Sequence, residues 1–142
     1  MEDEGPWAFL VKLDEELLIG GVIVSEWCSF IVRDHDTAFA GGAYLSSILA
    51  AVSGIETYLR SEYGGPKKES LHDLINSSPI KQELKDDLHR LRKYRNKWVH
   101  VEAPWTDEEL LADPERYENE LEEMGKFAAR ALRRTIYENQ CL

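Results

Sequence analysis

The sequence predicts an all-α protein, a bundle of four or five helices, and three observations support this fold class. Apolar residues recur at spacings of three and four along most of the chain, which is the period of a helix with one buried face. Capping and turn residues divide these periodic segments into lengths typical of helices. The 142 residues, 43% hydrophobic and 31% charged, suit one globular domain. We therefore predict a single domain over residues 1–142, with core helices over 7–33, 37–63, 80–101 and 114–138.

The first predicted helix covers residues 7–33, and its second half is ambiguous. Gly20 and Gly21 weaken a helix, and the valines and isoleucines around them favour extended backbone. A strand or hairpin over residues 17–32 is therefore an alternative. This apolar run of 16 residues contains Glu26, so it is too short and too polar to cross a membrane.

The second predicted helix covers residues 37–63. Asp36 or Thr37 suits its N-cap, and the glycine pair after residue 63 suits its end. One face of this helix carries only small residues, namely Ala43, Ser47, Ala50 and Gly54. Small residues at this spacing let another helix approach closely, and that helix is either the first one or part of a second subunit.

Three further segments complete the predicted bundle. A short helix is expected over residues 69–76, before the turn "NSSP", and a longer helix over 80–101 ends ahead of Pro104. A short capped turn then leads into the final helix, residues 114–138. This helix is acidic at its start and basic at its end, an order that the helix dipole favours.

The net charge of −10 is unevenly distributed along the chain. Residues 107–123 hold nine carboxylates and one arginine, whereas residues 88–101 hold bases and no acid. The overall charge argues against general coating of nucleic acid or of an anionic membrane. A basic island in an acidic protein favours a local anionic ligand.

The two cysteines, Cys28 and Cys141, give no disulfide framework, and the sequence offers no support for a bond between them. A reducing cytosol is the simpler interpretation. The acidic start, "MEDEGPW", lacks the basic region of a signal peptide. We therefore expect a soluble cytoplasmic protein without a membrane partner.

Two apolar stripes each contain a single ionised residue. Arg95 interrupts the stripe of residues 80–101, and Glu56 interrupts the stripe of residues 37–63. A charge at a core position is costly unless it is paired and hydrogen-bonded. Glu56 and Arg95 are therefore predicted either to meet between packed helices or to lie at the stripe edges and extend to water.

The segment "RNKWVH", Arg95 to His100, resembles the Arg-x4-6-His signature of HEPN domains, in which a polar residue follows the arginine. "LAAVSGIETYLR" resembles the helix of such domains that carries an acidic residue after an apolar run, here Glu56. The resemblance implies a helical bundle that dimerises with its motif helices facing. In many members the two motifs form a metal-independent endoribonuclease site, whereas other members have lost catalysis. One toxin branch has a tyrosine two residues after the histidine, and Glu102 stands there in this chain, so the tyrosine modification of that branch is not expected.

The chemistry of RNA cleavage fits these residue types, because the 2′-hydroxyl of RNA is a built-in nucleophile. His100 would act as general base, Arg95 would stabilise charge on the phosphate, and Asn96 would position one of them. On a straight helix Arg95 and His100 point about 140° apart, so we expect a two-fold dimer to bring them together. The RNA backbone would contact the neighbouring bases Arg92, Lys93 and Lys97, and core packing is the favoured role of Trp98.

We therefore expect a HEPN-type endoribonuclease, of the kind found in toxin or stress-response systems, that needs no metal or cofactor and that has an antitoxin or another protein partner. The alternatives are a catalytically silent HEPN-like module that binds RNA, nucleotide or protein, and a helical interaction protein in which the motif is coincidental. His35, in "RDHD", is interpreted as part of a solvated turn rather than as a metal ligand. His72 and His89 receive no role.

Overall fold

The computed structural model describes residues 5–141, and residues 1–4, which begin the acidic start of the chain, lie outside the described part. Seven helices occur in that part: α1 (Pro6–Leu17), α2 (Glu26–Ala40), α3 (Tyr44–Tyr63), α4 (Leu71–Ser77), α5 (Gln82–Val99), α6 (Glu108–Ala112) and α7 (Pro114–Ile136). No strand accompanies them between residues 5 and 141, so the all-α prediction is confirmed, with more helices than the four or five predicted. None of these helices is long and apolar enough to cross a membrane.

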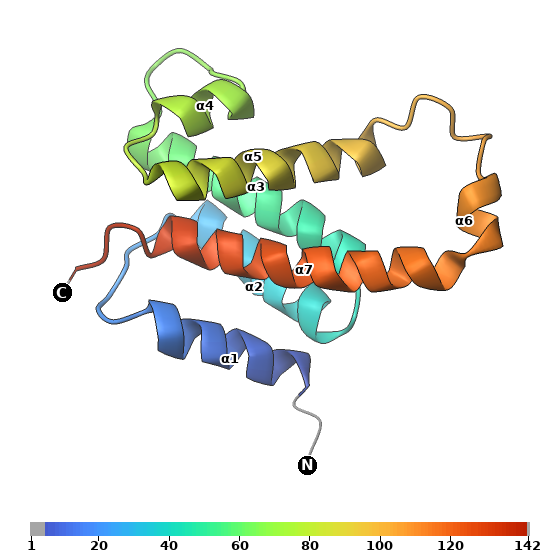
Figure 1. Ribbon diagram of the computed structural model, residues 1–142. Helices are drawn as coiled ribbons and strands as arrows, with labels where there is room; N and C mark the ends of the chain where they lie inside the picture. Colours follow the sequence, from blue (N-terminus) through green and yellow to red (C-terminus); the bar gives the residue numbers. More distant parts are fainter. Residues whose placement is uncertain (1–4, 142) are drawn as a thin grey trace.

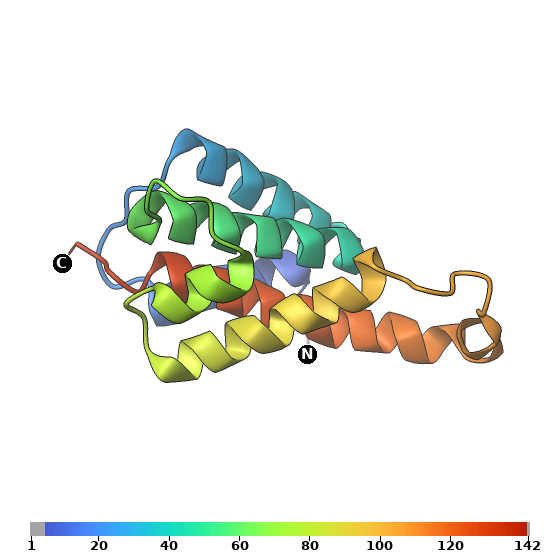
Figure 2. The same cartoon turned by 90° about the horizontal axis from the view of Figure 1, so that it is seen from above.

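Helices α3 and α7 form the centre of the bundle (Figure 1). Helix α2 packs along α3, and α1 packs against both α2 and α7. Helix α5 packs along α7 on the other side of the bundle, so α2 and α5 occupy opposite edges (Figure 2). The short α4 lies against α3 and α5.

The core follows the apolar stripes of the sequence. On α5 the predicted stripe is buried at Leu84, Leu88 and Leu91, against the buried side chains of α3 and α7. Burying a leucine side chain of this kind stabilises the fold by about 1.5–3 kcal/mol. A smaller cluster, which includes Leu13 and Phe39, joins α1 and α2 to α7. The apolar faces of the helices therefore account for how the bundle is held together.

The small face of α3 admits neighbouring helices, as predicted. A Cβ added at Gly54 would lie 3.0 Å from Cδ1 of Leu132 on α7 and 3.4 Å from Cγ2 of Ile31 on α2. Ser47 on the same face is fully buried. The close partners of this face are therefore helices of the same chain.

The predicted helix over residues 7–33 is wrong, because residues 18–25 form an extended connection between α1 and α2. Gly21 exchanges two backbone hydrogen bonds with Cys141, of 2.8 and 2.7 Å, in an isolated bridge rather than a hairpin. Oε1 of Gln140 accepts the N–H groups of residues 19 and 20. Ser25 then caps α2 with its side chain. Glycines and β-branched residues keep this segment extended, and the chain end supplies its hydrogen-bond partners.

The predicted start of the second helix at Asp36 or Thr37 is also wrong, because α2 continues through both residues to Ala40. The break comes at the following glycine pair. Gly42 has a φ of 80°, a conformation that glycine adopts easily, and the N–H of Ala43 donates to the carbonyl of Ala38 over 2.9 Å. This C-terminal motif ends α2, and α3 begins directly after it. The helices predicted over 69–76, 80–101 and 114–138 occur as α4, α5 and α7.

Candidate functional site

Helix α5 carries the basic island that the sequence predicts. Because its leucine stripe is buried, its remaining faces are left to the polar residues between the leucines. These include the arginines and lysines at positions 85, 90, 92, 93, 95 and 97. The helix ends at His100, whose N–H donates to the carbonyl of Asn96 over 3.0 Å. Cations near a helix C-terminus are favoured by the dipole, which is consistent with this arrangement.

The arginines of α5 have no carboxylate partner anywhere in residues 5–141. Arg90 lies over the ring of Phe127 at 4.5 Å, Arg92 contacts His89, and Arg95 contacts Asn96. Five other arginines each form an ion pair with an Asp or Glu side chain, namely Arg33, Arg60, Arg130, Arg133 and Arg134. The chain has 27 acidic residues and 17 basic ones, so acids are not scarce. The three arginines of α5 therefore have no carboxylate partner among the described residues, although the chain is rich in acids.

Asn96 contacts both residues of the motif. Its Oδ1 accepts a hydrogen bond of 2.9 Å from Nε of Arg95, and its backbone carbonyl accepts the N–H of His100. Arg95 is half-buried and His100 is exposed. Across the described residues, the terminal guanidinium nitrogens of Arg95 and the ring of His100 have no hydrogen-bond partner, and the two side chains do not contact each other. Both groups are therefore available to a ligand, but one chain does not bring them together.

The predicted pairing of Glu56 with Arg95 is wrong. Oε1 of Glu56 instead accepts a hydrogen bond of 3.0 Å from Nη2 of Arg60, one turn further along α3. Both side chains are about one-third exposed, 35% for Glu56 and 34% for Arg60. An i,i+4 pair at the surface avoids the desolvation cost of a buried pair between helices. The second alternative, charges at the stripe edges, describes both Glu56 and Arg95.

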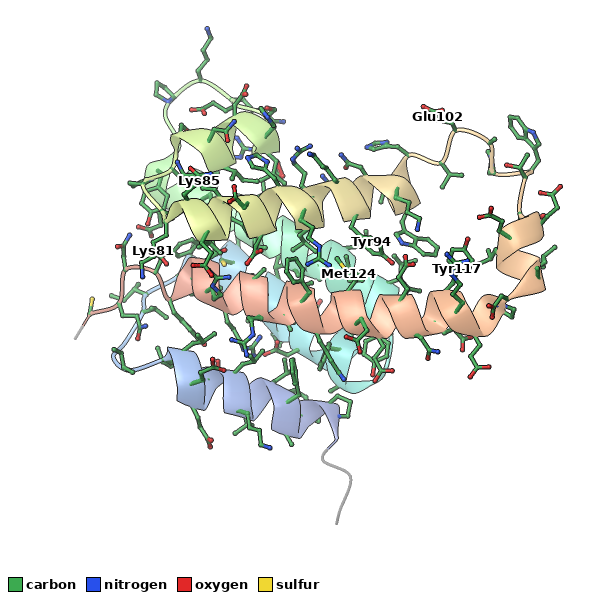
Figure 3. All side chains as sticks on the ribbon, in the orientation of Figure 1. Lys81, Lys85, Tyr94, Glu102, Tyr117 and Met124 are labelled. Atoms are coloured by element: carbon green, nitrogen blue, oxygen red, sulfur yellow. The ribbon has the colours of Figure 1, made fainter. Side chains whose placement is uncertain are left out.

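Lys97, the third predicted RNA contact, forms an ion pair with an acidic residue of α7, which offsets its charge. Its Nζ lies 3.1 Å from Oε1 of Glu120, which also accepts the hydroxyl hydrogen of Tyr94 over 2.8 Å. Burial, together with this hydrogen bond, raises the pKa of Tyr94 to about 12. Figure 3 shows Tyr94 and Tyr117 between α5 and α7, and both rings lie within 5.6 Å of Nζ of Lys97. Of the three predicted backbone contacts, only Arg92 and Lys93 remain unpaired with acids.

A cavity of about 600 Å3 lies beside the motif, between the end of α5, the following loop and α7. Trp98, Val101, Leu110 and Tyr117 contribute to its lining. Trp98 is half-buried, so it packs at the edge of the core rather than within it. Glu102 stands in the same loop and is exposed (Figure 3).

His35 and Arg133 belong to a buried ion-pair network that the sequence analysis missed. His35 is not part of a solvated turn but lies fully buried inside α2, with Nδ1 2.8 Å from Oδ1 of Asp36. Arg133 is 4% exposed, donates twice to Asp36 over 3.0 and 3.1 Å, and donates from Nε to Asp14 over 3.0 Å. Tyr137 donates to Asp14 over 2.6 Å. Burial opposes the ionisation of Asp36, but the hydrogen bonds from His35 and Arg133 outweigh it and lower the pKa of Asp36.

His72 and His89, which the sequence analysis left without a role, lie side by side. Their ring centroids are 5.1 Å apart, and the rings line a second cavity of about 600 Å3 between α4 and α5. Arg92 and Lys93 line the same cavity.

No group of three His, Cys, Asp or Glu side chains in residues 5–141 is arranged to hold a metal ion. Both cysteines are free thiols, and burial raises the pKa of Cys28.

Comparison of the chain with known proteins gives no family, because no family model, no curated protein sequence and no solved structure matches it. The fold and the site therefore define only a class of protein: a helical bundle with a basic helix, α5, at one edge, whose three arginines have no carboxylate partner in residues 5–141.

Proposed function

We propose that the protein is a HEPN-type endoribonuclease that cuts RNA without a metal ion, using Arg95, Asn96 and His100 from two copies of the chain. One observation carries the proposal: the arginines of α5 have no carboxylate partner within residues 5–141, although the chain has a net charge of −10, and their helix ends at an exposed histidine. RNA phosphates would supply the missing anionic partners.

The residues of the motif suit cleavage by the 2′-hydroxyl. His100 removes the proton from this hydroxyl, whose oxygen attacks the adjacent phosphorus. The bond from phosphorus to the 5′-oxygen breaks, and the leaving oxygen takes a proton from the imidazolium of His100. The products are a 2′,3′-cyclic phosphate and a 5′-hydroxyl end. Arg95 stabilises the charge on the phosphate, because Asn96 holds its Nε and leaves both terminal nitrogens for phosphate oxygens.

The proposal requires two copies, because Arg95 and His100 of one chain do not contact each other. Apolar residues flank His100 on the surface: Val99 is 43% exposed, Val101 51% and Trp105 75%. A second copy related by a two-fold axis would cover these residues and bring Arg95 of one chain towards His100 of the other. The proposed dimer is supported because the exposed apolar residues lie at the same end of the molecule as His100.

The test is cleavage of a panel of single-stranded and structured RNAs by wild type and by His100→Ala, in the presence of chelator. We expect wild type to cut RNA but not DNA and to leave a cyclic phosphate, and His100→Ala to be slower by about 10²–10⁴-fold. Glu102→Gln, exposed two residues further along the loop, is the control and should retain wild-type activity. Cutting that survives His100→Ala, or DNA cut as fast as RNA, would contradict the proposed site.

A second candidate is a catalytically silent module that binds RNA or nucleotide through α5. The ion pair of Lys97 with Glu120 favours it, because it offsets the charge of one of the three predicted backbone contacts. This candidate predicts binding of labelled RNA by wild type and His100→Ala alike, with no cleavage by either protein. Chromatography with light scattering separates the two further, since only the nuclease proposal requires a dimer.

A further inference from the structure

A cavity between α4 and α5 contains a cluster of imidazole and cationic groups, and the two histidines among them have no part in the proposed nuclease site. Its lining is made by His72, Asn76, Asp86, His89, Arg90, Arg92 and Lys93, of which Arg92 and Lys93 are also the predicted contacts to the RNA backbone. The cavity has a volume of about 600 Å3. Each of these residues comes from α4 or α5, so two helices supply all of the lining.

The fold places these residues together through the apolar faces of the two helices. On α4, burial of Leu74 and Ile75 turns His72 and Asn76, four residues apart, to the outside. On α5, the buried leucine stripe does the same for His89 and Arg92. Nζ of Lys85 donates to the carbonyl of Asn76 over 2.7 Å, which ties the two helices together at the cavity (Figure 3). The arrangement of the cavity residues is therefore fixed by the packed core of α4 and α5 and not only by contacts among the cavity side chains themselves.

The hydrogen bonds leave donors of this cluster unused. Nε2 of His89 lies 2.8 Å from Oδ1 of Asn76, so this nitrogen carries the proton, and Nδ1 faces Nη2 of Arg92 at 3.5 Å. Nε of Arg92 is buried and has no acceptor in residues 5–141. Nδ1 of His72 is 3.1 Å from Asp73, and its Nε2 has no hydrogen-bond partner in residues 5–141. Because Nε of Arg92 is buried, a ligand would contact the terminal nitrogens of this guanidinium, of which Nη2 faces His89 and Nη1 has no partner in the described residues.

The electrostatics of the cavity are positive. Burial, Arg92, His72 and Lys93, in that order, lower the pKa of His89, and Asp86 opposes them only weakly. The charged side chains that line the cavity are Arg90, Arg92, Lys93 and Asp86, and Asp73 contacts Nδ1 of His72. The contributions of Arg92 and Lys93 to this shift show that cationic groups lie close to His89, and cationic groups lining one cavity favour a bound anion.

We infer that this cavity binds a phosphate group, with Arg92 and Lys93 as its cationic ligands, His72 as an additional donor, and His89 beside the site in contact with Arg92. A tetrahedral anion matches several convergent N–H donors and accepts from a guanidinium through two oxygens. The phosphate belongs either to a phosphodiester of an RNA backbone or to a phosphomonoester at an RNA end or on a nucleotide. The inference does not depend on the proposed ribonuclease activity, since a phosphate can bind here whether or not His100 cuts RNA.

Binding should be linked to protonation. A bound phosphate replaces the repulsion between Arg92 and a charged His89 by attraction, so it raises the pKa of His89. For dimethyl phosphate, whose charge does not change in this range, affinity is then highest at low pH and falls as pH rises through the pKa of His89 in the complex. Methyl phosphate loses one of its own charges below about pH 6, which opposes this gain.

The experiment is nuclear magnetic resonance of the histidine ring signals, titrated with methyl phosphate, with dimethyl phosphate, and with 2′-O-methyl RNA decamers carrying a 5′-phosphate or a 5′-hydroxyl. RNA of this kind lacks the 2′-nucleophile, so a failure to bind is not confused with cleavage. We expect saturable shifts of His72 and His89 and a raised pKa of His89. Binding of methyl phosphate and the 5′-phosphorylated decamer alone identifies a monoester site, whereas binding of dimethyl phosphate and both decamers identifies a backbone site.

Charge-neutral variants give the decisive comparison. Arg92→Gln should weaken phosphate binding about 10- to 100-fold, the loss expected for one charge-assisted hydrogen bond. Lys93→Gln, at an exposed position, should also weaken it and does not disturb the core. Arg116→Gln, which removes a charge from an exposed arginine on α7, is the matched control and should bind as wild type does. Shifts confined to His100, or equal affinity in all three variants, would overturn the inference.

Discussion

Removing Asp36 should destabilise the protein strongly, because it strands a buried arginine. The side chain of Arg133 is 5% exposed and that of Asp36 is 18% exposed. Asp36→Ala removes both acceptors of the Arg133 terminal nitrogens and leaves only Asp14, bonded through Nε. Two charge-assisted hydrogen bonds and an uncompensated buried charge correspond to a loss of about 3–5 kcal/mol in the free energy of unfolding. His35 also loses the carboxylate that contacts its Nδ1.

Two comparisons set the scale for this prediction. Asp14 is 40% exposed, so solvent screens its bonds to Arg133 and Tyr137, and Asp14→Ala should cost only about 1–2 kcal/mol. Asp34→Ala removes a neighbouring carboxylate that is 73% exposed and pairs with Arg33, so it should change stability by less than about 0.5 kcal/mol.

The assay is urea unfolding followed by circular dichroism, with all variants at one protein concentration because a dimer would make stability concentration-dependent. The expected order of loss is Asp36→Ala, then Asp14→Ala, then Asp34→Ala. If Asp36→Ala is as stable as Asp34→Ala, Arg133 has an alternative partner and the network does not hold the three helices together. A larger loss for Asp14→Ala would show that the exposed member carries the interaction instead.

Three other predictions follow from the same contacts. Folding lowers the pKa of Asp36, so the stabilisation from its carboxylate is present above about pH 3.9, the pKa in the unfolded chain, and is lost as pH falls through the folded-state pKa. In urea titrations at acid pH, the free energy of unfolding of Asp36→Asn should therefore depend less on pH than that of wild type. Gln140→Ala should speed amide exchange at residues 19 and 20 without affecting α3, with a global cost of about 1 kcal/mol. Glu120→Gln frees Lys97, so anisotropy titrations with labelled RNA should show tighter binding and a salt slope steeper by about one.

Much of the bundle could be predicted from local patterns. The leucine stripe of α5 and the proline that opens α7 are signals contained within one helix, and both helices occur close to the predicted ranges. The connection at residues 18–25 could not be predicted in this way. Its partners, Gln140 and Cys141, are about 120 residues further along the chain, and an apolar run gives no sign of such distant hydrogen bonds.

The candidate site could be predicted only in part, because the sequence does not show which distant residues come into contact. A charge within an apolar stripe indicates a buried ion pair, but it does not identify the partner. The rule was applied to Arg95, whereas Arg133, which lies between Ala129 and Ile136 on α7, fits it better and does form the buried network. Glu56 has a basic residue one turn away on its own helix, and this local partner prevails over a distant one. The contact of His72 with His89 depends on how α4 packs against α5, which no periodicity reveals.

The two charge systems of the protein lie at different places in the fold, and this separation makes the proposals testable. The network around Arg133 joins α1, α2 and α7, whereas three arginines without an acidic partner in the described residues lie on α5, at the edge of the bundle opposite α2 (Figure 2). Substitutions at exposed Lys93 or His100 therefore remove a ligand contact without removing a structural one. Arg90 differs, because its guanidinium packs on Phe127 and its loss would weaken the contact between α5 and α7 as well. Loss of binding in the first group, with unchanged unfolding free energy, can then be assigned to the ligand and not to the fold.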